Sequence, residues 1–253
     1  MTLPDGSHLA VQLHGSAGAP IVLLIAGVAA DHTTWGTYPD SLATLGLRVI
    51  TYDHRGTGAS DDSTTDTLTT RSLAQDASDL LTTLGIPAAH VYGHSMGTRV
   101  AQWLAIDHPD QVITLTLGAG TGGDRLGVPR PEEATRALST GDPDMIAHCA
   151  LGPSVADDPA ARALLGTQQT SPQTLAHHLS ASTNHDAWDD LGRITAPTLV
   201  IHGTADRMTP VENAHRLAAA IPHATLHLLP GAGHGYFIET NDATQAFAGH
   251  IAR

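Results

Sequence analysis

Short apolar runs alternate along the chain with segments whose apolar residues recur at helical spacing. Six runs are predicted to be buried strands, at residues 21–26, 47–52, 89–92, 112–117, 198–202 and 224–229. None alternates cleanly between apolar and polar side chains, which is typical of strands covered by helices on both faces. Two helical faces between the runs comprise Leu73, Ala77, Leu80, Leu81 and Leu84, and Val211, Ala214, Leu217, Ala218 and Ile221. The pattern predicts an α/β fold with a mostly parallel, doubly wound sheet.

The two ends of this pattern carry more local signals. Residues 3–14, with a turn at Pro4-Asp5-Gly6, predict an antiparallel hairpin on one edge of the sheet. The sequence Thr209-Pro210-Val211-Glu212 predicts a capping box at the start of the second helix. Phe247 and Ile251, four residues apart, predict a short final helix.

Residues 121–191 interrupt the alternation. They contain six prolines and no strand-like run, and the clearest helical pieces cover 158–165 and 171–180. Their leucines make the segment too apolar for a disordered tether, and a loop of this length inside a compact domain usually has a structure or function of its own. We expect a core domain of residues 1–120 and 192–253, with 121–191 as a helical cap inserted over the carboxyl edge of the sheet.

Composition excludes several classes of function. A net charge of −13 disfavours binding to a nucleic-acid backbone, which requires clustered arginine and lysine. Seventeen histidines invite a metal hypothesis, but no His-Glu-x-x-His or Cys/His spacing accompanies them. Solvated or core histidines are the simpler interpretation, so neither a metal nor another cofactor is expected.

The compartment is predicted from what the chain lacks. Cys149 is alone, so no disulfide forms within the chain, and a reducing compartment is the default. The first residues have no basic and apolar signal-peptide pattern, and the longest apolar runs are too short to cross a membrane. We expect a cytoplasmic protein without a membrane association.

The stretch Gly93-His94-Ser95-Met96-Gly97 follows a predicted strand and precedes an apparent helix over 98–106. A G-x-S-x-G sequence in this setting predicts a sharp strand-to-helix turn that exposes the serine, and its glycines let neighbouring backbone pass closely. The helix dipole then favours negative charge near the serine. We therefore expect Ser95 to be a nucleophile.

A serine hydroxyl needs a base to accept its proton, and the base needs a carboxylate to orient it. Asp206 follows the strand at 198–202 and precedes a helix, although a surface turn aspartate is the alternative. Residues 118–120, at the other strand end where such an acid occurs, hold no carboxylate. His234 lies in a glycine-rich loop after the last strand, and no other histidine combines these features with the chain order Ser…Asp…His. Ser95, Asp206 and His234 are the predicted catalytic residues.

Backbone amides are expected to stabilise the developing oxyanion. One is that of Met96, after the nucleophile, and the other is that of Val28, in the loop after the strand at 21–26. Gly27, His94 and Trp35 are candidate substrate contacts, although His94 is expected to be a pocket wall, and Trp35 is more often a packing residue below the loop. Asp31 is a further candidate for substrate binding, with an N-cap as the favoured role.

A second glycine pattern needs to be weighed. Residues 118–123, Gly-Ala-Gly-Thr-Gly-Gly, match the dinucleotide-binding sequence G-x-G-x-x-G after a strand. Pro129 and Pro131 follow without a helix-forming stretch, so no helix N-terminus is available for a pyrophosphate. Dinucleotide binding is therefore not expected.

On these residues the chain resembles the α/β-hydrolase family over nearly its whole length. The resemblance rests on Ala26-Gly27, the stretch 52–60 (Tyr-Asp-His-Arg-Gly-Thr-Gly-Ala-Ser), the elbow at 93–97, residues 203–206 with Pro210, and Gly233-His234. Within the family, the chain most resembles small bacterial esterases and lactonases of the 3-oxoadipate enol-lactonase and aclacinomycin methylesterase types. The resemblance implies the same triad, the same oxyanion amides and a cap at 121–191. Two positions depart from many members: Ala26 replaces a histidine, and Thr98 replaces a second glycine.

The predicted reaction is hydrolysis of a small-molecule carboxylic ester or lactone through an acyl-enzyme. The same residues also suit C–C bond hydrolysis, acyl transfer or cofactor-free perhydrolysis. A non-enzymatic small-molecule receptor on this fold is an alternative of another class. No obligate protein partner is evident from the sequence.

Overall fold

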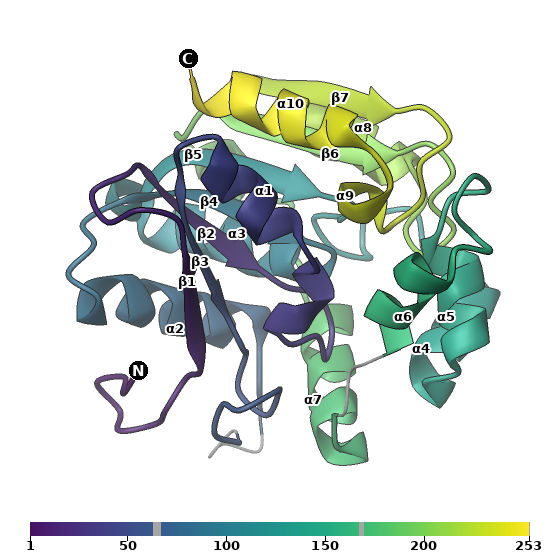
Figure 1. The fold of residues 1–253 in the computed structure, drawn as a ribbon, viewed down its shortest axis with the longest axis horizontal. Helices are drawn as coiled ribbons and strands as arrows, with labels where there is room; N and C mark the ends of the chain where they lie inside the picture. The colour runs from purple at the N-terminus through teal and green to yellow at the C-terminus, as the bar shows by residue number, and fades with distance from the viewer. Residues whose placement is uncertain (63–66, 167–169, 253) are drawn as a thin grey trace.

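The computed structural model describes residues 1–62, 67–166 and 170–252, which form a sheet flanked by helices (Figure 1). Within these ranges the sheet has seven strands in the order β1-β3-β2-β4-β5-β6-β7, and only β1 runs antiparallel to its neighbour. The strands are β1 Val11–His14, β2 Ile21–Ile25, β3 Arg48–Tyr52, β4 Ala89–His94, β5 Val112–Gly118, β6 Thr198–Gly203 and β7 Ala224–Leu229. The prediction of a mostly parallel, doubly wound sheet is confirmed.

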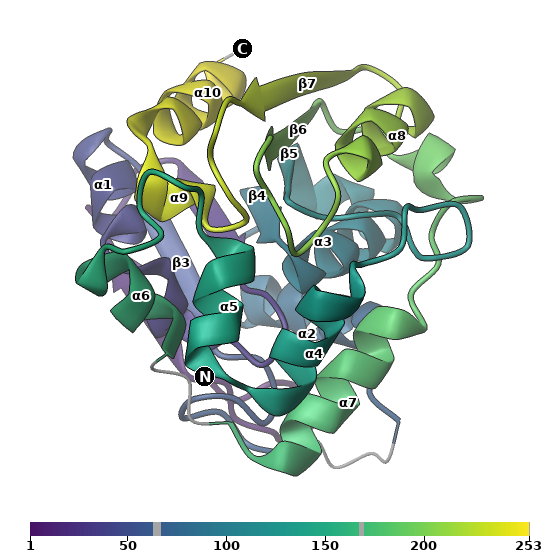
Figure 2. The ribbon, with the colours of Figure 1, turned by 90° about the vertical axis from the view of Figure 1, so that its right-hand side faces the viewer.

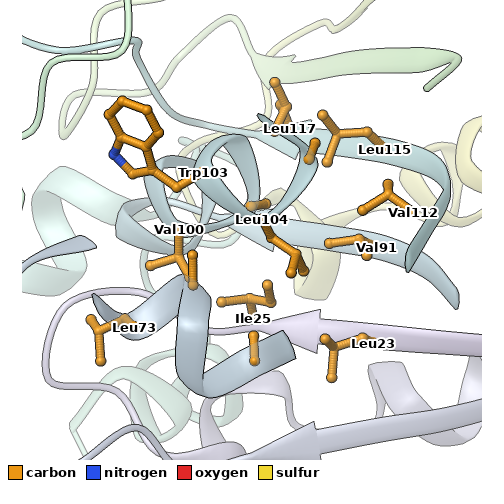
Figure 3. Packing of buried hydrophobic residues seen from close by; sticks show 14 of the residues in the cluster. Leu23, Ile25, Leu73, Val91, Val100, Trp103, Leu104, Val112, Leu115 and Leu117 are labelled. Carbon is orange, nitrogen blue, oxygen red and sulfur yellow. The ribbon is translucent and has the colours of Figure 1, made fainter. Parts of the chain in front are cut away.

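Helices cover both faces of the sheet (Figures 1 and 2). On one face lie α2 (Thr70–Thr83), α3 (Met96–Asp107) and α8 (Glu212–Ala220), and on the other lie α1 (Tyr38–Thr44) and α10 (Asn241–Ile251). Along β2, Leu23 and Ile25 pack toward α2 and α3 (Figure 3). Val22 and Leu24 pack toward α1 on the other face. Because both faces are buried, both sets of alternating residues must be apolar.

Two local predictions at the chain's ends need correction. Residues 2–10 form a turn and an isolated antiparallel bridge between Thr2 and His8 in place of a hairpin, and the antiparallel edge strand is β1, which pairs with β3. The capping box at Thr209 is wrong, because α8 starts at Glu212 after Val211 without a side-chain cap. The amide of Thr209 instead donates to the Asp206 carboxylate, so this threonine belongs to the loop after β6.

The described residues between β5 and β6 include the helices α4 (Glu132–Thr140), α5 (Pro143–Ala150), α6 (Pro159–Gly166) and α7 (Pro172–Thr183). The helices expected at 158–165 and 171–180 are α6 and α7. The described part of this connection contains no strand. In Figure 1, α4, α5 and α6 lie together beside α9 (Tyr236–Glu239), and α6 packs on the short 3-10 helix His32–Trp35. The side chain of Asp31 caps that 3-10 helix, as expected, by accepting from the amide of Thr33. The remaining short elements are the 3-10 helices Pro109–Gln111 and Leu191–Arg193.

Candidate active site

Ser95 stands at the turn between β4 and α3 in a strained conformation, with φ 58° and ψ −120°. Close packing forces the turn. A Cβ on Gly93 would lie 2.2 Å from the carbonyl oxygen of Gly97, and a Cβ on Gly97 would lie 2.0 Å from the carbonyl oxygen of Ile25. Only glycine fits at both positions, since real Cβ atoms do not approach backbone this closely. The G-x-S-x-G pattern is therefore a steric requirement of the turn.

Thr98, one of the two positions at which the chain departs from many members of the family it resembles, has a structural role beside the elbow. Its hydroxyl lies 3.0 Å from the carbonyl oxygen of Gly93 and 2.8 Å from that of Gly118 at the end of β5. A Cβ on Gly120 would lie 2.4 Å from the Thr98 Cβ, so the threonine needs a glycine opposite it. The amide of Ser95 also donates to the carbonyl of Gly118, at 2.8 Å. These bonds tie the elbow to the neighbouring strand.

Asp206 and His234 meet although 28 residues separate them in the chain. The His234 Nδ1 lies 2.8 Å from the Asp206 Oδ2, and the carboxylate is completely buried. The other oxygen, Oδ1, accepts from the amides of Met208 at 2.7 Å and Thr209 at 2.8 Å. Burial alone would raise the pKa of the Asp206 carboxyl, but the charge and hydrogen bonds of His234 and His202 hold it well below its usual range. Asp206 is therefore ionised and orients the His234 ring.

His202 is a partner of Asp206 that the sequence reasoning missed. It is fully buried at the end of β6, and its Nε2 lies 3.0 Å from the Asp206 Oδ2 and 2.9 Å from the carbonyl oxygen of Thr209. Because the carbonyl only accepts, Nε2 carries the proton and donates. The signal in the sequence was a single polar side chain at the end of an otherwise apolar strand, four residues before the acid.

A cavity of about 110 Å³ lies beside the elbow. Ser95, His234, Gly27 and Val28 all line it, so residues from three separate loops or turns face one space. A Cβ on Gly27 would lie 3.2 Å from the Ser95 Cβ, which shows how closely the loop after β2 approaches the serine. Met96, the residue after the serine, is buried at the first position of α3.

The two other candidate substrate contacts differ in position. His94 lines the cavity, and its Nε2 donates to the carbonyl of His234 at 2.8 Å. Burial, with the nearby His234, lowers the pKa of His94 to about 3, so this ring is too weakly basic to accept the serine proton. Trp35 is fully buried and does not line the cavity. Its ring packs against His94 at 6.0 Å and Phe237 at 4.9 Å between centroids, which is the packing role that the sequence offered as the alternative to a substrate contact.

The loop after β2 is held by residues from α7 and its approach. Ala29 has a φ of 53°, which is unusual for a residue with a side chain. Its amide donates to the Nδ1 of the buried His178 at 3.1 Å, and its carbonyl accepts from the Thr170 hydroxyl at 2.8 Å. The His178 Nε2 in turn donates to the carbonyl of Arg55 at 3.0 Å. His178 therefore helps to fix the loop that presents Val28, a role that spacing along the sequence did not indicate.

The loop that carries His234 is held in a similar way. The Glu239 carboxylate accepts from the amide of Gly233, at 3.0 Å for the nearer oxygen, and from that of Gly152 after α5, at 3.2 Å. The amide of Gly235 donates to the carbonyl of Ala150 at 2.9 Å. Burial raises the pKa of Glu239, against the effect of the two amide donors. The end of α5 and the His234 loop are thus joined on both sides of the histidine.

The described residues also bear on metal binding and on membrane crossing. Within the described ranges, no three His, Cys, Asp or Glu side chains are grouped so that they could hold a metal ion. Among the same residues, no helix is long and apolar enough to cross a bilayer.

Comparison with known proteins gives consistent results. A family model described as serine aminopeptidase, S33, matches residues 18–241. A protein named as the carbamate hydrolase RutD, from Caulobacter sp. (strain K31), is 30% identical over 96% of this chain and 94% of its own length. A 2-hydroxy-6-oxononadienedioate/2-hydroxy-6-oxononatrienedioate hydrolase from Burkholderia vietnamiensis is 32% identical over 91% of this chain and 86% of its own.

A solved structure adds the similarity in three dimensions. A thermophilic esterase from Thermogutta terrifontis superimposes with a TM-score of 0.83 at 25% identity, and covers 98% of this chain and 95% of its own. The seven-stranded sheet, the strained serine elbow and these matches agree with one another. The chain therefore belongs to the α/β-hydrolase family of enzymes.

Proposed function

We propose that the protein hydrolyses a small-molecule carboxylic ester or lactone with Ser95, His234 and Asp206 as its catalytic triad. The observation that carries the proposal is the contact of His234 with the buried Asp206 carboxylate, at 2.8 Å, because this histidine lines the same cavity as the strained Ser95. A histidine oriented by a carboxylate is what a serine needs to become a nucleophile.

The reaction proceeds in two halves. The Ser95 Oγ attacks the carbonyl carbon while the His234 Nε2 accepts the hydroxyl proton, and the Asp206 carboxylate stabilises the imidazolium. The amides of Val28 and Met96 hold the oxyanion, and the tetrahedral intermediate collapses as His234 protonates the leaving alcohol. A water that gives its proton to His234 then attacks the acyl-enzyme, and release of the acid returns the Ser95 hydroxyl.

We also propose that residues 121–191 act as the cap over this site. Leu138 of α4, Ile146 of α5 and Leu165 of α6 line the cavity together with Ser95. The apolar side chains of the connection therefore supply much of the wall against which an acyl chain would pack.

With Cys149 as its one cysteine, the protein suits a reducing compartment, in keeping with action in the cytoplasm.

A fluorophosphonate probe tests the nucleophile, and a panel of p-nitrophenyl and aliphatic esters and lactones tests the reaction. We expect stoichiometric labelling of Ser95, loss of labelling in Ser95→Ala and steady turnover of short-chain esters. The proposal would be refuted if the Ser95→Ala variant still hydrolysed esters. It would also be refuted if Ser95 of the intact wild-type enzyme reacted with neither the probe nor any ester.

Hydrolysis of a C–C bond is the second candidate, and it is supported by the similarity to the oxononadienedioate hydrolase. Both reactions use a nucleophile, a base and an oxyanion site, so they share the residues proposed above. A vinylogous 1,5-diketone cleaved with a kcat/KM at least tenfold above that of any ester would favour this candidate.

A further inference from the structure

One charged side chain reaches the cavity beside Ser95. Of the described residues that line this space, only Arg130 carries a full charge. The neighbouring walls are largely apolar, with Val28, Leu138, Ile146 and Phe237 among them. A guanidinium stays protonated in proteins, so Arg130 places a fixed positive charge at the edge of an apolar site.

Arg130 has no partner for this charge in the part of the chain that the structure describes. Its Nε is buried without a hydrogen-bond acceptor, and the guanidinium forms no ion pair there. The charges of Asp124 and Asp206 act on it from a distance. Neither is available, because Asp124 pairs with Arg99 at 3.3 Å and Asp206 is bound by two histidines and two amides.

A second cavity shares this residue. Arg130, Met208 and Thr209 line both spaces, and Arg99 and Asp124 line the second one. The described residues that line the second cavity include two positively charged arginines and one negatively charged carboxylate. This local excess of positive charge occurs in a chain whose net charge is −13. Burial of an unpaired cationic donor is unfavourable, so the arrangement is suited to an anion that arrives with a ligand.

We propose that Arg130 binds a carboxylate of the substrate, so that the enzyme acts on anionic esters or lactones such as monoesters of dicarboxylic acids. The inference rests on the proposed ester hydrolysis and names the substrate class of that same site. The planar guanidinium presents Nε–H and Nη–H groups in parallel, which match the two oxygens of a carboxylate. The reacting carbonyl lies at Ser95 while the carboxylate lies at the wall between the two cavities.

The test compares substrates that differ only in this charge. We expect kcat/KM for the monomethyl esters of succinate, glutarate or adipate to exceed that of the methyl esters of butanoate, pentanoate or hexanoate. The best pair should differ by roughly 10- to 100-fold, as for a hydrogen bond to a charged group. In Arg130→Met the ratio should fall to about 1, and in Arg130→Lys it should be intermediate, since lysine keeps the charge without the bidentate geometry.

Arg136→Met is the matched control. Arg136 lies in α4, six residues away, and its exposed side chain approaches only Glu132, at 3.7 Å, among the residues described. The Arg136→Met variant loses the same charge without altering the cavity wall. It should therefore hydrolyse the anionic and the neutral methyl esters as the wild type does. Thermal unfolding of each variant verifies that it is folded.

A wild-type ratio of 1 or below, or a ratio that survives in Arg130→Met, would overturn the inference while ester hydrolysis itself stands. If no ester is hydrolysed and the fluorophosphonate does not label Ser95, the proposed function fails, and a binding experiment still decides on Arg130. Calorimetric titration of Ser95→Ala with monomethyl glutarate and with methyl pentanoate should show tighter binding of the anion. Equal binding of the two would overturn the role of Arg130 without reference to turnover.

Discussion

The strain at Ser95 predicts that glycine at this position makes the protein more stable than alanine. Ser95→Ala and Ser95→Gly both remove the hydroxyl, and both should abolish turnover if Ser95 is the nucleophile. They differ in the backbone, because φ 58° with ψ −120° disfavours any residue that carries a Cβ. Glycine accepts this conformation without the penalty.

The expected difference follows from three contributions. A residue held in such a region costs about 1–3 kcal/mol, which glycine removes. Glycine loses about 0.4–1 kcal/mol through the greater freedom of its unfolded chain. The half-buried Cβ adds roughly 0.4 kcal/mol in favour of alanine, about half the value of a fully buried methylene. The strain is the largest contribution, so Ser95→Gly should be more stable than Ser95→Ala by about 1 kcal/mol.

Thermal unfolding of the two variants measures this difference. For a chain of this size, about 1 kcal/mol corresponds to a rise in Tm of roughly 2–4 °C. Ser180, exposed in the interior of α7, offers the matched control, since glycine there should be less stable than alanine by about 1 kcal/mol. If the elbow pair shows the same sign as the Ser180 pair, strain at the elbow is not what sets its stability, and the reasoning fails.

Three further predictions concern the residues around the elbow and the N-terminal turn. Asp206→Asn should lower kcat/KM by about 10⁴-fold, because an amide cannot accept from two backbone amides and two histidines at once; an ester assay that shows less than a tenfold loss would contradict the triad. His178→Ala should lower kcat by roughly tenfold with little change in KM, because the variant misplaces the Val28 oxyanion donor, and misplacing a donor should cost less than the roughly 10²- to 10³-fold lost on removing one. His177→Ala, at the neighbouring position, is the control, and equal effects of the two substitutions would refute the role of His178. The Ser7 hydroxyl and amide, with the Arg55 guanidinium, lower the pKa of Asp5 from 3.8 to about 2, so this group stabilises the fold above pH 3.8 and the contribution is lost as the pH falls through 2. In denaturant unfolding, wild type should therefore be more stable than Asp5→Asn by a constant amount above about pH 4, and this difference should shrink between pH 4 and 2. The change should be smallest in high salt, because Asp5 is exposed and salt screens its charge. A difference that grows on acidification would show that the sign is wrong.

Local periodicity was sufficient to predict the sheet. The apolar runs on both faces of β2 through β6 required helices on both sides, and these strands end within about two residues of their predicted bounds. The elbow was equally local, because Gly93 and Gly97 flank the residue whose turn they make sterically possible. Local reasoning failed where another residue of the same loop competed for a hydrogen-bonding group. Thr209 matched a capping box, but its amide is used by Asp206.

The surroundings of the site depended on contacts between distant segments. Ala29 meets His178 across 149 positions, and Gly152 meets Glu239 across 87. Arg130 lines the same cavity as Ser95, and its buried Nε has no acceptor within the described part of the chain, which no local pattern in the sequence indicates.

The division between sequence and structure has a physical origin. The direction of a side chain along a strand or helix repeats every 2.0 or 3.6 residues, so strands, helices and the serine elbow were determined by neighbours in the sequence. Which loops meet at the carboxyl edge depends on how the packed sheet places them, and hydrogen bonds form only between groups at the right distance and angle. The sequence by itself therefore determined the fold class and the candidate nucleophile. Only the tertiary structure decided which groups surround Ser95, and that Arg130, at the cavity wall, has no partner for its charge among the residues described.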